Sequence, residues 1–362
     1  MDYKEILKEQ FHNVIDLDQI DDISKETYEL SEGLSESFSL EKILESTLNG
    51  ESFFHNQELI SGIKDLALYE IRNAMILGVE ILIICVVIGL LKNLSASFGS
   101  KSMSDISMLV CTMVIIGISM NSFRIVYQLA LDSVSVMVST MEILTPILLG
   151  IMISTGAVTS GSILSPVIIG SVTGFGVILK KIILPALFVA TILGLINCLT
   201  EKDYVNKLGK LIRNASLIVT GLIIAVLTGI ITIQGLITET SDSLLMSAAK
   251  YSLSTFIPIV GGFTSDTIEL FLRCMGTIKN VVGVFAVITL VLIVVVPLIK
   301  ILIIALIYKL TAAVTEPVSE SKISDGLNEM GSCLISMASI MFFCALLFIM
   351  FVSIILRIGG NA

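Results

Sequence analysis

Long apolar stretches constrain the fold of this chain more than any other feature of its sequence. They lie between polar or charged segments and cover residues 76–91, 106–120, 182–199, 216–237, 281–307 and 334–356. A helix of about 20 apolar residues crosses the hydrocarbon core of a bilayer, where only helices and closed barrels satisfy every backbone polar group. Hydrophobic residues make up 55% of the 362 residues and charged residues only 15%. The sequence therefore predicts an all-α, polytopic helical membrane protein.

A further apolar region, residues 143–179, predicts an interrupted passage through the membrane. It holds two prolines and six glycines, which include Pro146 and Gly150, and both residue types weaken a helix interior. The region fits either two short spans or a re-entrant hairpin followed by one span, which gives about seven to eight spans in total. Lys180 and Lys181, directly after it, are expected to mark its end.

Charge divides the chain into two regions at about residue 75. Residues 1–75 hold 17 acidic and 6 basic residues, a net charge of −11, whereas residues 76–362 hold 14 and 16, a net charge of +2. We expect an acidic, soluble helical region, either an interaction surface or an ordinary solvated domain, followed by a multi-span membrane domain. No apolar stretch opens the chain, so either a signal peptide has been removed or the first span directs insertion.

Residues 122–142 predict a helix with one continuous polar face. At 100° per residue, six polar side chains fall within about 80° of one another, and they are Arg124, Gln128, Asp132, Ser135, Ser139 and Glu142. Apolar residues occupy the other faces of this helix. Such a helix either lies in the membrane interface or lines an aqueous path through the protein, and the sequence leaves both interpretations open.

The segment of residues 256–267, FIPIVGGFTSDT, predicts a second interruption. Pro258 removes a helical hydrogen-bond donor, and the pair Gly261 and Gly262 lowers helix propensity. A broken backbone at membrane depth needs shielding by protein or by water, so the segment is a candidate gate, binding site or helix-packing joint. The polar helix face expected after the break carries Asp266, Glu269 and Arg273.

Two regions, residues 106–200 and 216–308, share an order of features. In each, an apolar span leads into an amphipathic segment with an Asp-Ser pair and then into the motif Pro-Ile-x-x-Gly. The two motifs, Pro146–Gly150 and Pro258–Gly262, lie about 110 residues apart. Paired broken segments are typical of transporters built from internal repeats. The similarity is either a structural repeat or a chance result of the biased composition, and we interpret both motifs as candidate gates.

The positive-inside rule predicts the orientation of the chain. The densest basic cluster of the membrane domain lies within residues 202–213 and is expected on the cytoplasmic side. With eight crossings, the acidic N-terminal region and residues 238–280 then lie outside, and Lys180-Lys181 is an exception to the rule. If residues 143–160 form a hairpin instead, Lys180-Lys181 moves inside, but the larger cluster moves outside.

The sequence gives no sign of enzymatic chemistry. Its two histidines, His12 and His55, lie in the acidic N-terminal region, and its six cysteines include no CxxC pair. The motifs GxxxxGK[ST], GxSxG and HExxH are also missing. We therefore expect no catalytic residues, cofactor, metal site or nucleic-acid partner, and any energy for transport has to come from a gradient or from another subunit.

The segment Phe256–Thr267 resembles the signature segment of the stage III sporulation protein AE family. The run Leu90-Leu91-Lys92-Asn93-Leu94 and the order of acidic region, broken spans and C-terminal helix are similar as well. The resemblance covers essentially the whole chain. It implies a membrane protein of an endospore-forming bacterium, located in the mother-cell membrane around the forespore, but it supplies no catalytic residue.

The same resemblance implies partners. It predicts a channel or secretion-like complex with other proteins of the same operon, including an ATPase and ring-forming subunits, and in some species a docking partner on the forespore. Such a complex would support late forespore development. The alternative, suggested by the similarity between residues 106–200 and 216–308, is a self-sufficient secondary transporter for a small solute.

Overall fold

The structure, a computed structural model, describes residues 57–98, 101–199, 205–256, 261–317 and 321–358, and all regular structure in these ranges is helical. The long helices are α4 (Gln57–Phe98), α5 (Lys101–Ser154), α6 (Val158–Ile178), α7 (Leu184–Ile196), α8 (Asn206–Phe256), α9 (Gly261–Thr315) and α10 (Ser321–Arg357). A π-helical turn, η3 (Leu179–Ile183), joins α6 to α7, and a short 3₁₀ turn, η4 (Asn197–Leu199), follows α7. The all-α prediction is therefore confirmed for this part of the chain.

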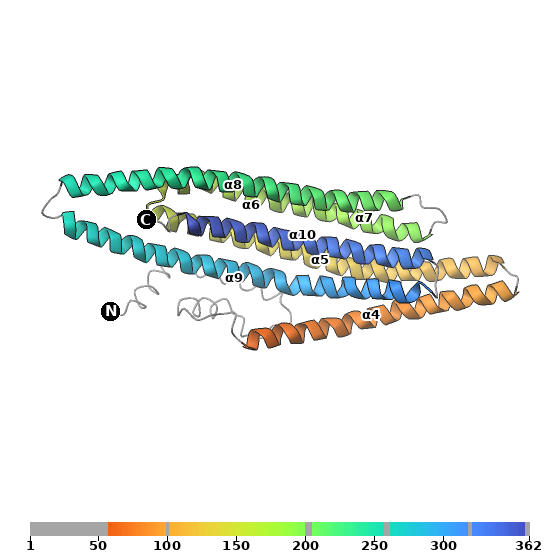
Figure 1. Cartoon of the computed structure of the whole chain (residues 1–362). Coiled ribbons are helices and arrows are strands. Elements are labelled where there is room, and N and C mark those ends of the chain that lie inside the picture. The colour runs from red at the N-terminus through yellow and green to blue at the C-terminus, as the bar shows by residue number, and fades with distance from the viewer. Residues whose placement is uncertain (1–56, 99–100, 200–204, 257–260, 318–320, 359–362) are drawn as a thin grey trace.

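The helices lie side by side in an elongated bundle (Figure 1). Helices α4 and α5, α7 and α8, and α9 and α10 meet at one end of the bundle, and α5 meets α6 at the other end. Within the described ranges, six helical segments are long and apolar enough to cross a membrane, and they cover residues 67–90, 109–154, 158–199, 206–242, 275–315 and 321–357. The prediction of an integral membrane protein is confirmed, whereas the count of seven to eight spans is not.

The predicted interruption at Pro146 and Gly150 is wrong. Helix α5 runs through both residues to Ser154, because the loss of one helical hydrogen bond at a proline is tolerated where packing holds the helix on both sides. Leu144 and Leu148, which flank Pro146, are both fully buried. The helix ends instead next to Gly156, whose φ of 95° is favourable only for glycine.

Lys180 and Lys181 do not end a span, contrary to the sequence prediction. Both lie in η3, and the helical backbone continues through this turn into α7. A π-helical turn accommodates one extra residue without breaking the helix and often occurs at functional sites. Helices α6 and α7 therefore form one candidate span with two lysines in its interior.

The core of the bundle is densely filled with apolar side chains. Fully buried residues of α5, α9 and α10 meet there, among them Met137, Met141, Phe285, Met337 and Phe348. The pair α9 and α10 is the most extensively packed. A Cβ atom at Gly331 of α10 would lie only 3.0 Å from the backbone oxygen of Ala305, which shows how closely these two helices approach.

Helix α4 is shifted along the bundle axis relative to the other helices. Gly78, in the middle of its apolar segment, packs against Ile307 and Thr311 of α9. Lys309, between these two residues, bonds to Asn328 in the polar first turns of α10. The centre of the apolar segment of α4 therefore lies level with the polar end of α10, and the joined ends of α4 and α5 project beyond α7, α8, α9 and α10 (Figure 1).

Candidate functional site

Helix α5 has a core face and a polar face, as its sequence predicts. Its core face buries Phe123, Ala130, Val134, Met137 and Met141 completely. On the polar face the charged and amide side chains are exposed and the two serines are half-buried; the set comprises Arg124, Gln128, Asp132, Ser135, Ser139 and Glu142. Gln128 Nε2 donates a hydrogen bond of 2.9 Å to Asp132 Oδ1.

The polar face continues from α5 onto α6 and η3. Thr173 Oγ1 on α6 donates a hydrogen bond of 2.8 Å to Glu142 Oε1. Lys180 Nζ on η3 lies 3.2 Å from Ser135 Oγ, to which it donates, and the neighbouring Lys181 is exposed. We call this surface the α5–η3 face, and it consists of Arg124, Gln128, Asp132, Ser135, Ser139, Glu142, Thr173, Lys180 and Lys181.

The α5–η3 face lies between the two polar levels of the bundle. Lys180 is 14 residues before Gly194, about 21 Å along the helix, and Gly194 packs against Glu329. In the other direction it is 20 residues after Ser160, about 30 Å, where Asp242 binds the start of α6. Lys180 therefore lies in the interior of its span rather than at either end.

Helix α8, which packs against α6, α7 and α10, is apolar at this depth. Residues 214–238 of α8 carry no charge, and Leu222, Val226 and Ile230 are exposed there. Residues 214–238 extend from Arg213, which pairs with Glu329 at one polar level, almost to Asp242 at the other. At one depth, then, the bundle presents apolar side chains suited to lipid on α8 and charged side chains on α5 and η3.

Asp242, which belongs to the second Asp-Ser pair of the sequence, joins two helices. Asp242 lies inside α8, and its buried carboxylate accepts the backbone N–H groups of Thr159 at 2.8 Å and Ser160 at 2.9 Å. The first amides of a helix have no partner within the helix. Asp242 therefore caps α6 from a neighbouring helix, a role that only the packing of the two helices determines.

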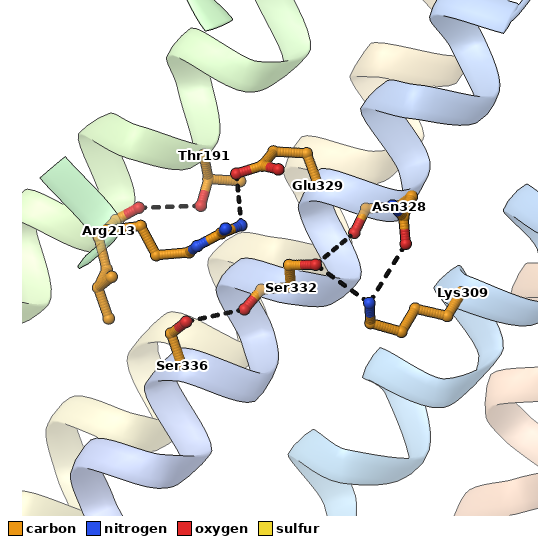
Figure 2. A network of polar contacts seen from close by, with 8 residues as sticks. Thr191, Arg213, Lys309, Asn328, Glu329, Ser332 and Ser336 are labelled. Carbon is orange, nitrogen blue, oxygen red and sulfur yellow. Dashed lines mark hydrogen bonds and ion pairs between the residues drawn. The ribbon is translucent and has the colours of Figure 1, made fainter. Parts of the chain in front are cut away.

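A second polar cluster lies where α7, α8, α9 and α10 meet (Figure 2). Arg213 of α8 forms an ion pair with Glu329 of α10, and both side chains are largely buried. Lys309 Nζ of α9 donates to Asn328 Oδ1 at 3.2 Å and to Ser332 Oγ at 3.1 Å. Sequence analysis missed this cluster because its charges come from different helices. A signal was available in Asn328, Ser332 and Ser336, which recur every fourth residue on α10.

Two further lysines hold helices together. Lys279 is fully buried and donates a hydrogen bond of 3.1 Å to the backbone oxygen of Ile358, directly after α10. Lys300 of α9 lies 3.1 Å from the buried carboxylate of Glu70, near the start of the apolar segment of α4. A cation near a helix C-terminus interacts favourably with the free carbonyl groups there. Both contacts are interhelical, so neither was visible in the sequence.

The other predicted gate residues lie at or beyond the limits of what the structure describes. Pro258 falls in residues 257–260, outside the described residues. Gly261 and Gly262 are the first residues of α9, and Asp266, Glu269 and Arg273 follow in the same helix, but their side chains are outside the described set. Their role as a gate remains a prediction, as does that of Pro146 and Gly150, which lie exposed within α5.

These features define the class of protein: a helical integral membrane protein with six candidate spans and a charged surface in the interior of two of them. The sequence profile of the stage III sporulation protein AE family matches residues 38–359, and the chain belongs to this family. It is 27% identical over 316 residues to the stage III sporulation protein AE of Bacillus subtilis (strain 168), an alignment that covers 86% of this chain and 78% of the relative. No solved structure matches the chain.

The family match confirms the resemblance inferred from residues 256–267 and establishes a role in sporulation.

Proposed function

We propose that this chain is the membrane-embedded subunit of a channel or secretion-like complex in the mother-cell membrane around the forespore, where it supports late forespore development. The observation that carries the proposal is the α5–η3 face. It exposes Arg124, Asp132, Glu142 and Lys181 on the interior part of two candidate spans. A charged side chain at the bilayer centre costs about 2.5–3.5 kcal/mol on insertion scales. Contact with water in a conduit removes that cost.

The packing of the bundle supports a conduit on the surface of the chain rather than in its interior. The interior between α5, α9 and α10 is filled by fully buried apolar side chains such as Met141, Phe285 and Phe348. A secondary transporter with a central site between two repeats needs polar groups in that interior. The described core therefore favours a surface conduit over a self-sufficient transporter.

The proposed complex has further components. We propose that an ATPase and ring-forming subunits of the same operon supply energy and a continuation of the conduit, with no enzymatic activity in this chain itself. Docking on a forespore partner belongs to the same proposal. Co-purification of the tagged chain from sporulating cells tests it: stable association with an ATPase and ring proteins is expected. Ion-coupled solute uptake by the purified chain alone would support the transporter instead.

Water access to the α5–η3 face tests the conduit directly. In a chain with its six cysteines replaced, Gln128→Cys and Ser139→Cys are expected to react rapidly with a small, charged thiol reagent. The control Val226→Cys, an exposed apolar position on α8, is expected to react slowly because lipid covers it. Equal, slow reaction at all three positions would show that the α5–η3 face does not meet water.

Sporulation provides the second readout. Glu142→Leu and Asp132→Leu remove charge from the α5–η3 face without touching the core, since both side chains are exposed. We expect both variants to reduce the yield of heat-resistant spores while the protein accumulates to a normal level in the membrane. Normal spore yield from both variants would contradict the proposed role of this face.

A further inference from the structure

Asp132 and Lys181 carry opposite charges at nearly the same depth on neighbouring elements. Lys180, next to Lys181, binds Ser135, which is three residues from Asp132 in α5. At 1.5 Å per residue, the two charges are within about one helical turn of each other along the bundle axis. Both side chains are exposed, and within the described part of the chain the structure records no acceptor for the Lys181 ammonium.

Near these charges, α6 leaves open space at two of its glycines. An added Cβ at Gly170 or Gly174 of α6 would meet nothing within 4 Å, and the same is true of Gly150 on α5. Gly174 directly follows Thr173, a member of the α5–η3 face. Exposed small residues in a membrane helix allow another helix to approach closely. The face therefore combines an exposed carboxylate, an exposed ammonium group without a recorded acceptor and open space on α6 for a neighbouring helix.

We infer that copies of this chain assemble around the proposed conduit, with Asp132 of one copy paired to Lys181 of the next. The inference rests on the conduit proposed above and names its partner, a second copy of the chain. The charged side chains of the α5–η3 face sum to about +1. Two copies of this face therefore repel each other only weakly. A neighbour rotated about an axis along the membrane normal brings its charges to the same depth, which is what a pair between Asp132 and Lys181 requires.

A test by charge exchange between chains separates this contact from any contact within one chain. The variant Asp132→Lys carries two positive charges at the contact, and Lys181→Asp carries two negative charges. Each variant alone is expected to lose assembly by about tenfold or more in affinity, since like charges meet at every contact. When the two variants are co-expressed with different tags, every contact between unlike chains regains opposite charges, and mixed assemblies are expected.

The measurement is the mass of the purified full chain in lipid nanodiscs or detergent, together with the ratio of the two tags. A mixed assembly that forms no better than either variant alone overturns the inference. So does a wild-type chain that is monomeric under all conditions, which would leave the α5–η3 face to another protein or to solvent alone. Restoration by the double variant but not by the mixture would place the charge pair within one chain and also overturn it.

A steric variant gives an independent outcome. Gly174→Phe fills the open space beside the face and is expected to weaken assembly, whereas Gly221→Phe fills equally open space on α8 and is expected to leave it unchanged. The reverse pattern would place the contact between copies on α8. Wild-type assembly combined with slow thiol reaction at Gln128→Cys and Ser139→Cys would leave the inferred contact intact and reject the conduit, so the two proposals fail separately.

Discussion

Asp242 is the residue that fixes the start of α6. Its carboxylate binds the N–H groups of Thr159 and Ser160 from α8, so it joins two helices and satisfies two amides at once. Loss of a side-chain cap typically costs about 0.5–2 kcal/mol. We expect Asp242→Ala to lower the free energy of unfolding by about 1–2 kcal/mol, measured by thermal unfolding in detergent. The control Thr240→Ala, an exposed position of the same helix, is expected to change little; an equal loss in both would contradict the assigned role.

Gly331 tests the close approach of α9 and α10. A methyl group there meets the backbone oxygen of Ala305 and the side chain of Lys309, and overpacking of this kind typically costs about 1–3 kcal/mol. Gly331→Ala is therefore expected to lower the melting temperature. Gly221→Ala adds the same methyl group to open space on α8 and is expected to maintain or raise it. A neutral Gly331→Ala would show that the two helices can separate without cost.

At the residue scale, the sequence predicts the direction of a side chain well where the periodicity of a single helix determines it. The polar face from Arg124 to Glu142 follows from helical periodicity alone, and the structure places all its members on one side of α5. The contact of Lys180 with Ser135 depends on the packing of α6 against α5, and no local pattern contains that information. The same reason explains why the binding of Asp242 to a neighbouring helix was missed.

Polar contacts join α8 to neighbouring helices near its start and at Asp242. Arg213 pairs with Glu329 of α10 near its start, and Asp242 binds α6 after 29 further residues. Between these two contacts its outward side chains, such as Val226, are exposed and apolar. These two polar contacts add to the apolar packing of α8 against α6, α7 and α10 and fix its position along the bundle.

The ion pair between Arg213 and Glu329 predicts an asymmetric response to substitution. Removal of one partner leaves a buried charge alone, whereas replacement of both by apolar residues is often neutral. We expect Arg213→Met to destabilise the chain by about 1–3 kcal/mol, since both groups retain slight exposure. The double variant with Glu329→Leu is expected to recover most of the loss. Thermal unfolding of both in nanodiscs provides the comparison, and a double variant weaker than Arg213→Met would contradict the prediction.

At the scale of elements, the sequence predicts the membrane helices better than it predicts where they are interrupted. The apolar runs overlap all six candidate spans of the described residues, but the prolines and glycines of residues 143–179 suggested breaks that mostly do not exist. Pro146 and Pro166 lie inside α5 and α6, since neighbouring helices support the backbone around them. Only Gly156, with its positive φ, ends a helix. Composition signals a weakened helix, and packing decides whether it breaks.

At the scale of the described bundle, several basic residues lie toward one end. Lys92, Lys101, Lys207, Lys322 and the polar cluster of Figure 2 all lie toward the end of the bundle where α4 meets α5 and α9 meets α10. The positive-inside rule predicts that this end lies in the cytoplasm. In a six-span chain, residues 202–213 are then expected on the cytoplasmic side, in agreement with the sequence prediction. Lys180-Lys181 is no longer an exception to the rule, because it lies within a span rather than in a loop.

Labelling of single cysteines in intact cells measures this orientation. In the cysteine-free chain, Lys101→Cys, Asn206→Cys and Ser321→Cys are expected to be protected from a membrane-impermeant maleimide. Ser154→Cys, an exposed position at the end of α5, is expected to react, and a cysteine added after Arg357 is expected to react as well. Labelling of Asn206→Cys but not of Lys101→Cys would imply an odd number of crossings between them and would reject the six-span arrangement.

The shift of α4 determines the total height of the apolar surface along the bundle axis. From Gly78 to Leu90, α4 extends about 18 Å past the level of Lys309 and Asn328. From that same level the uncharged residues 330–356 of α10 extend about 40 Å in the opposite direction. The hydrocarbon layer of a bilayer is only about 30 Å thick. A flat bilayer therefore covers only part of this height, and the rest has to be covered by other protein or by locally thickened lipid.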